Sequence, residues 1–536
     1  MYIKKEVIFA AISGLLLTVA FSGNIFSFLG WIALVPLFAG LRNLSPGGAF
    51  RIGMIAGMVH YLTLLYWVVF TMRVYGLLPW WLCFFFLALL AAYLSLYPGF
   101  FSFFLVRYCR RPIRLVILAP LFWVGLEYIR TFLLTGFPWS LLGYSQFHRI
   151  NLVQIADLAG VYGIAFLVVL VNAGICLLLL NAAEKTWQGV WVGRWQARSA
   201  GVLALGLVLA AVFYGQHRIT AISSVMADAP MVRVSFVQGN IDQATKWDPA
   251  FQIRTTRKYV EMTQSLASDP PDLVVWPETA MPFYFEEGQG LASMVTSMAR
   301  EMGVYLVLGS PRAVGDVPEK EAYYNSAYLV TPEGRVAADH YDKFHLVPFG
   351  EYVPLKSVLF FVGKMVSHVG DFSSGQKGHT LKWKPDAPDL GVQICFESIF
   401  PGLSRLLVKN GAGLLVNLTN DAWFGKTSAA GQHFTMAAFR AIENRRSLVR
   451  CANTGISGIV DPVGRVTRQT GLFQDAVMVE RVPLLGETTL YTRFGDWLPR
   501  ICLIVMGILL VAGWRRRRAG SAPTTRYTSS VNRMKI

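Results

Sequence analysis

Apolar and polar residues separate into long blocks along the chain. Between residues 7 and 214, apolar runs alternate with short polar loops at 7–20, 25–41, 52–74, 77–106, 115–134, 161–180 and 200–214. An eighth run, 501–514, follows a long polar region. An α-helix needs roughly 20 residues to cross the hydrocarbon core, and the runs approach that length, with the first, seventh and eighth short. The pattern predicts an eight-helix transmembrane bundle, with seven spans before the polar region and one after it.

The first apolar run also fits a signal peptide, because it follows Lys4 and Lys5. A second apolar run begins almost at once, at residue 25. We therefore expect an uncleaved first span.

Basic residues are unevenly divided between the loops on the two sides of the predicted bundle. With the N-terminus in the cytoplasm, the cytoplasmic segments hold Lys4, Lys5, Arg42, Arg51, Arg107, Arg110, Arg111, Arg114, Lys185, Arg194, Arg198, Arg515, Arg516, Arg517 and Arg518. The short loops on the other side hold only Arg73, Arg130 and Arg149. Because basic loops stay in the cytoplasm, both termini are predicted to be cytoplasmic. In a bacterium, the polar region would then lie in the periplasm, beside the inner membrane.

The polar region has the pattern of one large α/β domain. Short apolar runs such as 232–237, 273–276 and 391–394 alternate with helical patterns such as 251–266 and 431–445. Alternation of this kind favours layers of sheet and helix. The predicted organisation is a seven-span part at 1–214, an extracytoplasmic domain at 215–496, an eighth span at 497–518 and a basic cytoplasmic tail at 519–536.

Composition supports a membrane protein and argues against other classes. Charged residues make up 15% of the chain, against about 25% in a typical soluble domain. The formal net charge is +17, but the basic residues cluster between apolar runs. Lipid headgroups are therefore more plausible anionic partners than nucleic acid.

The sequence lacks the common metal and nucleotide motifs. It contains no H-E-x-x-H motif, P-loop or G-x-G-x-x-G fingerprint, so we expect no cofactor and no metal. Six cysteines without a C-x-x-C pair signal neither a disulfide framework nor a zinc site. We expect Cys395 and Cys451, the two in the polar region, to be free thiols rather than a disulfide.

Three predicted strands of the polar region end in groups suited to thiol chemistry. Glu278 follows the run 273–276, Lys343 lies in the segment 341–354, and Cys395 follows the run 390–394. Alone, each residue has an ordinary explanation, since most free cysteines are small buried hydrophobes and most glutamates and lysines are solvated. Together they supply a nucleophile, a carboxylate base that generates the thiolate, and an ammonium that stabilises an oxyanion. The less favoured alternative is a catalytic Cys–His pair of Cys395 with His345 or His433.

The order of these segments resembles the Glu-Lys-Cys signature of the nitrilase, or carbon–nitrogen hydrolase, superfamily. The matching segments are Pro277-Glu278, Asp342-Lys343-Phe344-His345 and Cys395-Phe396-Glu397. Seven spans before this domain and one after it resemble the apolipoprotein N-acyltransferases of bacterial inner membranes. The resemblance implies a nitrilase-like α-β-β-α sandwich, with Glu278 as general base, Lys343 as oxyanion stabiliser and Cys395 as nucleophile.

Further residues match supporting positions of that family. Glu351 matches a glutamate that holds the lysine and the ligand, Glu397 matches the acidic residue after the cysteine, and Asn325 matches a polar residue near the site. Phe396 stands where some members carry tyrosine. Gln238 and Trp247 match the segment that opens the domain.

The resemblance implies a two-step acyl transfer. A phospholipid would donate an acyl chain to Cys395, and the thioester would pass it to the α-amino group of the diacylglyceryl-cysteine of an apolipoprotein, the last step of lipoprotein maturation. We expect a monomer. One alternative is a membrane-tethered nitrilase or amidase that hydrolyses small amides. A second is a transporter or receptor with an extracytoplasmic binding domain, which predicts polar residues inside the spans; His60 and Glu127 are the main ones.

Several apolar side chains are candidate membrane contacts. Phe360 and Phe361 lie in the apolar segment 355–366. This segment could form an ordinary core helix or a lid that dips into the lipid interface. Trp423 and Phe424 form a candidate second anchor. Trp139 lies in an outside loop that would face the polar domain from the membrane side, although aromatic residues favour this depth of the membrane anyway. Asn417, Asn420 and Asp421 follow another strand, and we favour ordinary turn residues over a cleft lining there.

Overall fold

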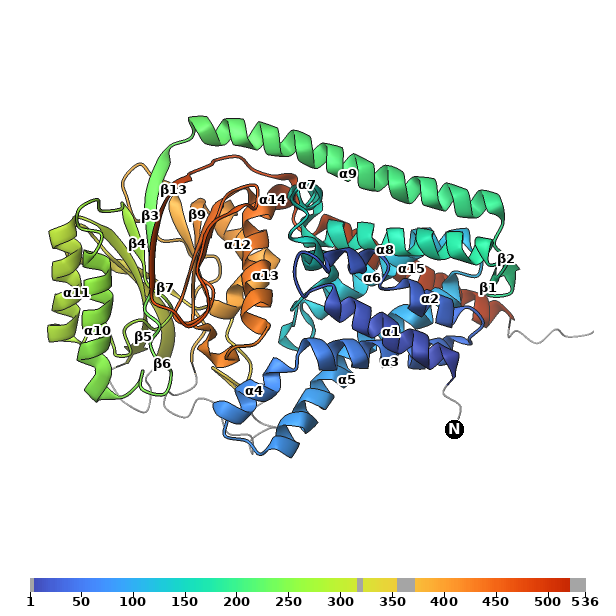
Figure 1. Cartoon of the computed structure of the whole chain (residues 1–536), viewed down its shortest axis with the longest axis horizontal. Helices are drawn as coiled ribbons and strands as arrows, with labels where there is room; N and C mark the ends of the chain where they lie inside the picture. Colours follow the sequence, from blue (N-terminus) through green and yellow to red (C-terminus); the bar gives the residue numbers. More distant parts are fainter. Residues whose placement is uncertain (1–3, 316–321, 354–371, 521–536) are drawn as a thin grey trace, which may run out of the picture.

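The computed structural model describes residues 4–315, 322–353 and 372–520. A helical part and a two-sheet part lie side by side, and the long helix α9 (Arg194–Asp228) runs along the helical part (Figure 1). All six cysteines, which fall within these ranges, are free thiols.

Each predicted apolar run corresponds to helical structure. The helices are α1 (Lys5–Val19), η1 (Ser27–Trp31), α2 (Val35–Leu41), α3 (Pro46–Leu64), α4 (Trp67–Val74), α5 (Trp80–Tyr108), α6 (Ile113–Arg130), α8 (Ala156–Ala182), α9 and α15 (Trp497–Gly520). Within the described residues, α5, α8, α9 and α15 are long and apolar enough to cross a membrane. The bent pair α3 and α4, with an angle of 52° between them, makes a fifth candidate. The protein is therefore multi-pass, while the count of eight stays a prediction.

Helix α9 continues past the predicted domain boundary at 214 and ends at Asp228. Its last turns are less apolar, but Ile219 and Ile222 are buried against Val463 and Leu485 of the sheet part. This small core explains why the helix extends into the second part without a break.

The second part contains two stacked sheets. The six-stranded sheet has the order β13-β3-β4-β5-β6-β7, with β3 (Met231–Gln238), β4 (Leu273–Val275), β5 (Tyr305–Val314), β6 (Ala322–Val330), β7 (Val336–Asp342) and β13 (Ala476–Pro483). The five-stranded sheet has the order β12-β11-β10-β9-β8, with β8 (Asp389–Ile394), β9 (Ala412–Thr419), β10 (Ser447–Ala452), β11 (Gly458–Val460) and β12 (Val466–Gln469).

Alternate residues of each strand face opposite layers, as strand geometry requires. Val234 and Phe236 of β3 share a core with Val392 and Ile394 of β8, between the sheets. On the outer face of the six-stranded sheet, Val237 packs with α10 (Pro249–Gln264) and α11 (Gln289–Met302). Helices α12 (Pro401–Lys409) and α13 (Ala429–Asn444) lie on the other side (Figure 1). The result is the predicted α-β-β-α order of layers.

The layer formed by α12 and α13 also contacts the membrane helices. Phe439 of α13 packs against Tyr144 and Phe147, with ring centroids 5.0 Å and 5.8 Å apart. The buried residues of α13 and of the helical part belong to one continuous apolar cluster. The sandwich is therefore joined to the bundle by a hydrophobic core rather than by a linker.

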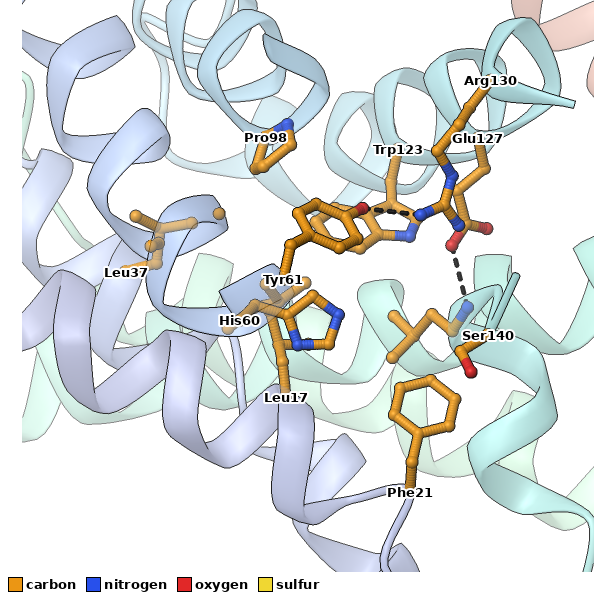
Figure 2. A pocket seen from close by; sticks show the side chains of 14 residues that line it. Leu17, Phe21, Leu37, His60, Tyr61, Pro98, Trp123, Glu127, Arg130 and Ser140 are labelled. Carbon is orange, nitrogen blue, oxygen red and sulfur yellow. Dashed lines mark hydrogen bonds between the residues drawn. The ribbon is translucent and has the colours of Figure 1, made fainter. Parts of the chain in front are cut away.

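A polar cluster lies inside the helical part (Figure 2). Arg130 donates a hydrogen bond to the Tyr61 hydroxyl at 2.6 Å, and Glu127 accepts one from the Leu142 backbone N–H at 2.8 Å. These groups and His60 line a cavity of about 20 Å³, room for about one water molecule. Glu127 thereby holds the loop that follows α6, a loop that reaches the sheet part.

Candidate active site

Cys395 begins the short 3-10 helix η5 (Cys395–Ile399) directly after strand β8. Its backbone φ is +52°, a left-handed conformation that is uncommon for residues other than glycine and that often marks functional turns. Its carbonyl oxygen lies 3.0 Å from the Ser398 hydroxyl and 3.1 Å from Nε2 of His433. The strained turn is thus held by two polar side chains.

Glu278, Lys343, Glu351 and Asn325 form one buried cluster. Nζ of Lys343 lies 2.9 Å from Oε1 of Glu351 and 3.5 Å from Oε1 of Glu278. The amide nitrogen of Asn325 donates to the same two oxygens, at 2.8 Å to Glu278 and 3.0 Å to Glu351. Glu351 also accepts the Val347 backbone N–H through its second oxygen, at 2.8 Å. The ammonium and the amide therefore fix both carboxylates.

The charges of this cluster set the protonation of its members. Burial alone would lower the pKa of Lys343, but Glu351 and Glu278 raise it above its ordinary value, so the side chain stays an ammonium. Burial raises the pKa of the Cys395 thiol, the charge of Glu278 raises it further, and Lys343 acts against both. The resting thiol is therefore protonated and needs a base.

Glu278 has a free oxygen for that task. Within the described part of the chain, Oε2 of Glu278 is buried without a hydrogen-bond partner, while Oε1 is occupied by Asn325. A carboxylate oxygen in this state can accept a proton from a neighbouring thiol.

Glu397 ties the lysine segment to the cysteine turn. It accepts hydrogen bonds from the Tyr341 hydroxyl and from the backbone N–H groups of Phe344, His345 and Ile394, at 2.7 to 3.0 Å. Burial raises its pKa, and these donors oppose the shift. One side chain therefore spans the ends of β7 and β8, where Lys343 and Cys395 lie.

The side chains of three other predicted site residues make contacts outside the cluster of Glu278, Lys343 and Glu351. Gln238 makes its hydrogen bonds to Ser457, Thr470 and the carbonyls of Gly471 and Gln474, so it joins β3 to the β11–β12 region. Trp247 is half-buried in the turn before α10. Phe396 packs against Phe400, with ring centroids 5.3 Å apart.

The Trp139 loop faces the sheet part, as predicted, but the Trp139 side chain is not a membrane contact. Its side chain is 1% exposed, its indole N–H donates to Gln432 of α13 at 2.6 Å, and its ring lies 5.7 Å from that of His433. The contact with the sheet part removes this aromatic side chain from the lipid.

Trp423 and Phe424 contact helix α4 of the bundle. The Trp423 ring meets Tyr75 edge-on at 4.8 Å, and the Phe424 ring meets Trp67 at 4.9 Å. They join the two parts of the protein. Phe360 and Phe361 lie outside the described residues.

Two features near the site were missed in the sequence. Lys246 is buried and donates to the Glu278 carbonyl at 3.1 Å, and burial lowers its pKa to about 8 against the effect of Glu278. Its position in a polar turn gave no signal of burial.

The second feature is a buried network behind Cys395. Asp421 contacts Arg450 at 2.8 Å and His433 at 2.9 Å, and Asn417 accepts a hydrogen bond from Arg450. The interpretation of Asn417 and Asp421 as ordinary turn residues is wrong, since Asn417 lies within β9 and Asp421 is buried in an ion pair. His433 faces the carbonyl of Cys395, and no hydrogen bond joins His345 or His433 to the thiol among the described residues.

Two family models match the two parts of the chain. The family model for the apolipoprotein N-acyltransferase N-terminal domain matches residues 13–174, and that for carbon-nitrogen hydrolases matches residues 233–488. The apolipoprotein N-acyltransferase of Geobacter metallireducens is 42% identical over 515 residues, 96% of each chain. That of Methylococcus capsulatus is 33% identical over 522 residues, 97% of this chain and 98% of its own. An amidase structure from Nesterenkonia sp. AN1 is 20% identical with a TM-score of 0.36 and covers 50% of this chain and 92% of its own. The chain, with both domains matched and relatives that align along nearly its whole length, belongs to the apolipoprotein N-acyltransferase family.

Proposed function

We propose that the protein transfers an acyl chain from a phospholipid to the α-amino group of the diacylglyceryl-cysteine of apolipoproteins, through a thioester on Cys395. Family membership supports the donor and the acceptor. The observation that carries the chemistry is the cluster of Glu278, Lys343 and Glu351 at the strand ends that also present Cys395. A helical layer that shares its core with the membrane helices lies behind this cysteine.

In the first step, the free oxygen of Glu278 takes the thiol proton as the sulfur attacks the ester carbonyl of the phospholipid. The ammonium of Lys343 and the backbone N–H of Phe396 stabilise the oxyanion. Collapse breaks the ester C–O bond, and Glu278 returns the proton to the departing lysophospholipid. The acyl chain stays on sulfur as a thioester.

In the second step, the neutral α-amine of the apolipoprotein attacks the thioester carbonyl, and Glu278 accepts the proton that the nitrogen releases. The same two donors stabilise the second oxyanion. The C–S bond breaks, the sulfur regains a proton, and the amide product leaves. Glu351, Asn325 and Glu397 hold the ammonium and the turn in place through both steps.

Mass spectrometry of the full-length protein incubated with phospholipid tests this proposal. We expect an acyl adduct on Cys395 that hydroxylamine removes and that Cys395→Ala lacks. Addition of a diacylglyceryl peptide with a free amine should transfer the chain to that peptide. Absence of an adduct with every phospholipid would contradict the proposal, and transfer to water alone would favour the amidase alternative.

We also propose the finer membrane arrangement: eight spans, both termini in the cytoplasm and residues 215–496 in the periplasm of a bacterial inner membrane. The distribution of basic loop residues supports it. The protein would act as a monomer without a cofactor.

Paired cysteine labelling tests this orientation, because the native cysteines are buried. Arg254 on α10 and Lys185 after α8 are both exposed. In intact spheroplasts, an impermeant maleimide should label Arg254→Cys but not Lys185→Cys, and both after permeabilisation. The reverse pattern would overturn the orientation.

A further inference from the structure

His433 of α13 faces the Cys395 turn. Its Nε2 lies 3.1 Å from the Cys395 carbonyl oxygen, and the Ser398 hydroxyl lies 3.0 Å from the same oxygen. Both side chains are buried. A buried carbonyl that faces two such groups has a fixed direction.

The direction of this carbonyl determines the direction of the next N–H. The peptide unit that joins Cys395 to Phe396 is planar, and in a trans peptide the C=O and N–H groups point to opposite sides. A donor that holds the carbonyl toward α13 therefore turns the Phe396 N–H away from α13. That N–H is the backbone donor that the proposed mechanism uses.

The imidazole is itself held on its other side. Nδ1 of His433 lies 2.9 Å from Asp421 and 3.0 Å from Nη2 of Arg450, and Arg450 pairs with the second oxygen of Asp421 at 2.8 Å. The Thr419 hydroxyl donates to Asp421 at 3.0 Å. Because Arg450 can only donate, Nδ1 accepts from its Nη2, and the proton of the neutral ring lies on Nε2, which faces the Cys395 carbonyl.

Aromatic side chains from both parts of the protein shield this group from water. The ring of Trp139 lies 5.7 Å from the imidazole and that of Phe424 lies 6.0 Å away. Trp139 belongs to the loop that Glu127 of α6 holds through Leu142. The imidazole thus lies in a dry contact between the two parts of the protein, where a hydrogen bond is stronger than in water.

We infer that His433 is a positioning residue: its Nε2–H orients the peptide between Cys395 and Phe396 so that the Phe396 N–H stabilises the oxyanion. This inference deepens the proposed function and rests on it. His433 touches neither the thiol nor the acyl group, and it acts through the backbone.

Two substitutions separate donation from shape. In His433→Gln, the side-chain amide nitrogen can occupy the place of Nε2 and donate to the Cys395 carbonyl. In His433→Asn, the amide nitrogen reaches only the place of Nδ1, beside Asp421. His217 is exposed on α9, and His217→Asn is a matched control for loss of an imidazole elsewhere.

Two reactions of Cys395 serve as readouts in the full-length protein in detergent micelles. Release of p-nitrophenol from a p-nitrophenyl ester needs an oxyanion donor, whichever lipid is the natural donor. Alkylation by iodoacetamide needs the thiolate but forms no oxyanion. We expect His433→Asn to slow the ester reaction by about 10²- to 10³-fold, the effect of one lost oxyanion donor, and to leave alkylation within about twofold of wild type.

His433→Gln should restore most of the ester reaction, and His217→Asn should match wild type. An unchanged ester reaction in His433→Asn would overturn the inference. An equal loss of both reactions, or no rescue by glutamine, would also overturn it by showing a general structural role. Absence of phospholipid acylation in wild type would instead count against the proposed function, because the ester assay does not depend on it.

Discussion

Glu443 of α13 accepts a hydrogen bond from the backbone N–H of Val161 at 3.0 Å, at the point where the membrane helix α8 is interrupted. The interruption is at Gly160, whose φ is +65° and ψ is −168°, a conformation open essentially to glycine alone. The break leaves the Val161 N–H without an intrahelical acceptor, as at any helix start. A carboxylate of the sheet part therefore caps a helix of the bundle, which couples the two parts directly.

The Glu443 carboxyl should make stability depend on pH. Burial raises its pKa to about 7, with Arg440 opposing the shift, whereas an unfolded glutamate titrates near about 4.3. Between these values the folded protein binds more protons, so the free energy of unfolding falls as pH rises from about 4.3 to 7 and then levels off. In Glu443→Gln, which keeps an acceptor oxygen for Val161, this contribution should disappear.

Thermal unfolding of both proteins in detergent at pH 5 and pH 7.5 measures this difference. Between pH 5 and pH 7.5, the melting temperature of wild type should fall more than that of Glu443→Gln. Glu443→Ala, which removes the acceptor, should be less stable at both pH values, by about 1–3 kcal/mol for one unsatisfied buried donor. Equal pH slopes in wild type and Glu443→Gln would contradict the prediction.

Replacement of Glu278 should move two reactions of Cys395 in opposite directions. The charge of Glu278 raises the pKa of the thiol, so Glu278→Gln should increase the thiolate fraction and speed alkylation by iodoacetamide at pH 8 by up to about tenfold, one pKa unit. Acyl transfer should fall by about 10²- to 10⁴-fold, because the base is lost.

Lys343→Met is the matched control, since the ammonium lowers the pKa of the same thiol. In that variant both alkylation and acyl transfer should slow. Mass spectrometry of the Cys395 peptide reports both reactions, and the melting temperature checks the fold. Slower alkylation in Glu278→Gln would show that the thiol does not experience this charge.

Glu397→Gln should loosen the connection between the lysine segment and the cysteine turn. The Glu397 carboxylate is the acceptor in all its hydrogen bonds with Tyr341, Phe344, His345 and Ile394. A glutamine would point its NH₂ group at some of these donors. We expect a loss of stability of about 2 kcal/mol or more, as for a buried donor left unsatisfied, and a matching fall in kcat. Tyr341→Phe, which removes one donor and keeps the acid, should cost about 1 kcal/mol. A Tyr341→Phe protein less stable than Glu397→Gln would be inconsistent with this role.

Local patterns predicted the elements and the position of Glu278, Lys343 and Cys395 at strand ends, because apolar runs and strand ends are visible within a few residues. Contacts between residues distant in sequence were not visible in this way. The Trp139 loop was expected to face the domain, but the contact of Trp139 with His433, 294 positions later, was not predicted. Burial of Lys246 and Asp421, both in polar segments, depends on partners from other strands and loops. The sequence therefore predicted where the candidate reacting groups lie better than it predicted the network around them.

The contact between η6 (Asp421–Phe424) and α4 should be sensitive to one methyl group. Gly425 has φ +57° and ψ −156°, and a Cβ there would lie 2.4 Å from the ring of Phe70. Gly425→Ala therefore combines backbone strain of about 1–3 kcal/mol with a steric clash against a membrane helix. We expect a lower melting temperature and reduced acyl transfer, because the adjacent Phe424 packs against His433.

Gly431, in the first turns of α13, provides the opposite control, because a Cβ there meets no atom within 4 Å. Gly431→Ala should raise the melting temperature, by an amount equivalent to about 0.5–1 kcal/mol for glycine to alanine in a helix. The double variant Phe70→Ala/Gly425→Ala should recover the steric part of the loss but not the backbone strain. A Gly425→Ala protein as stable as wild type would show that η6 does not pack against α4 in this way. It would also contradict the proposed contact from the bundle to His433 through Phe424.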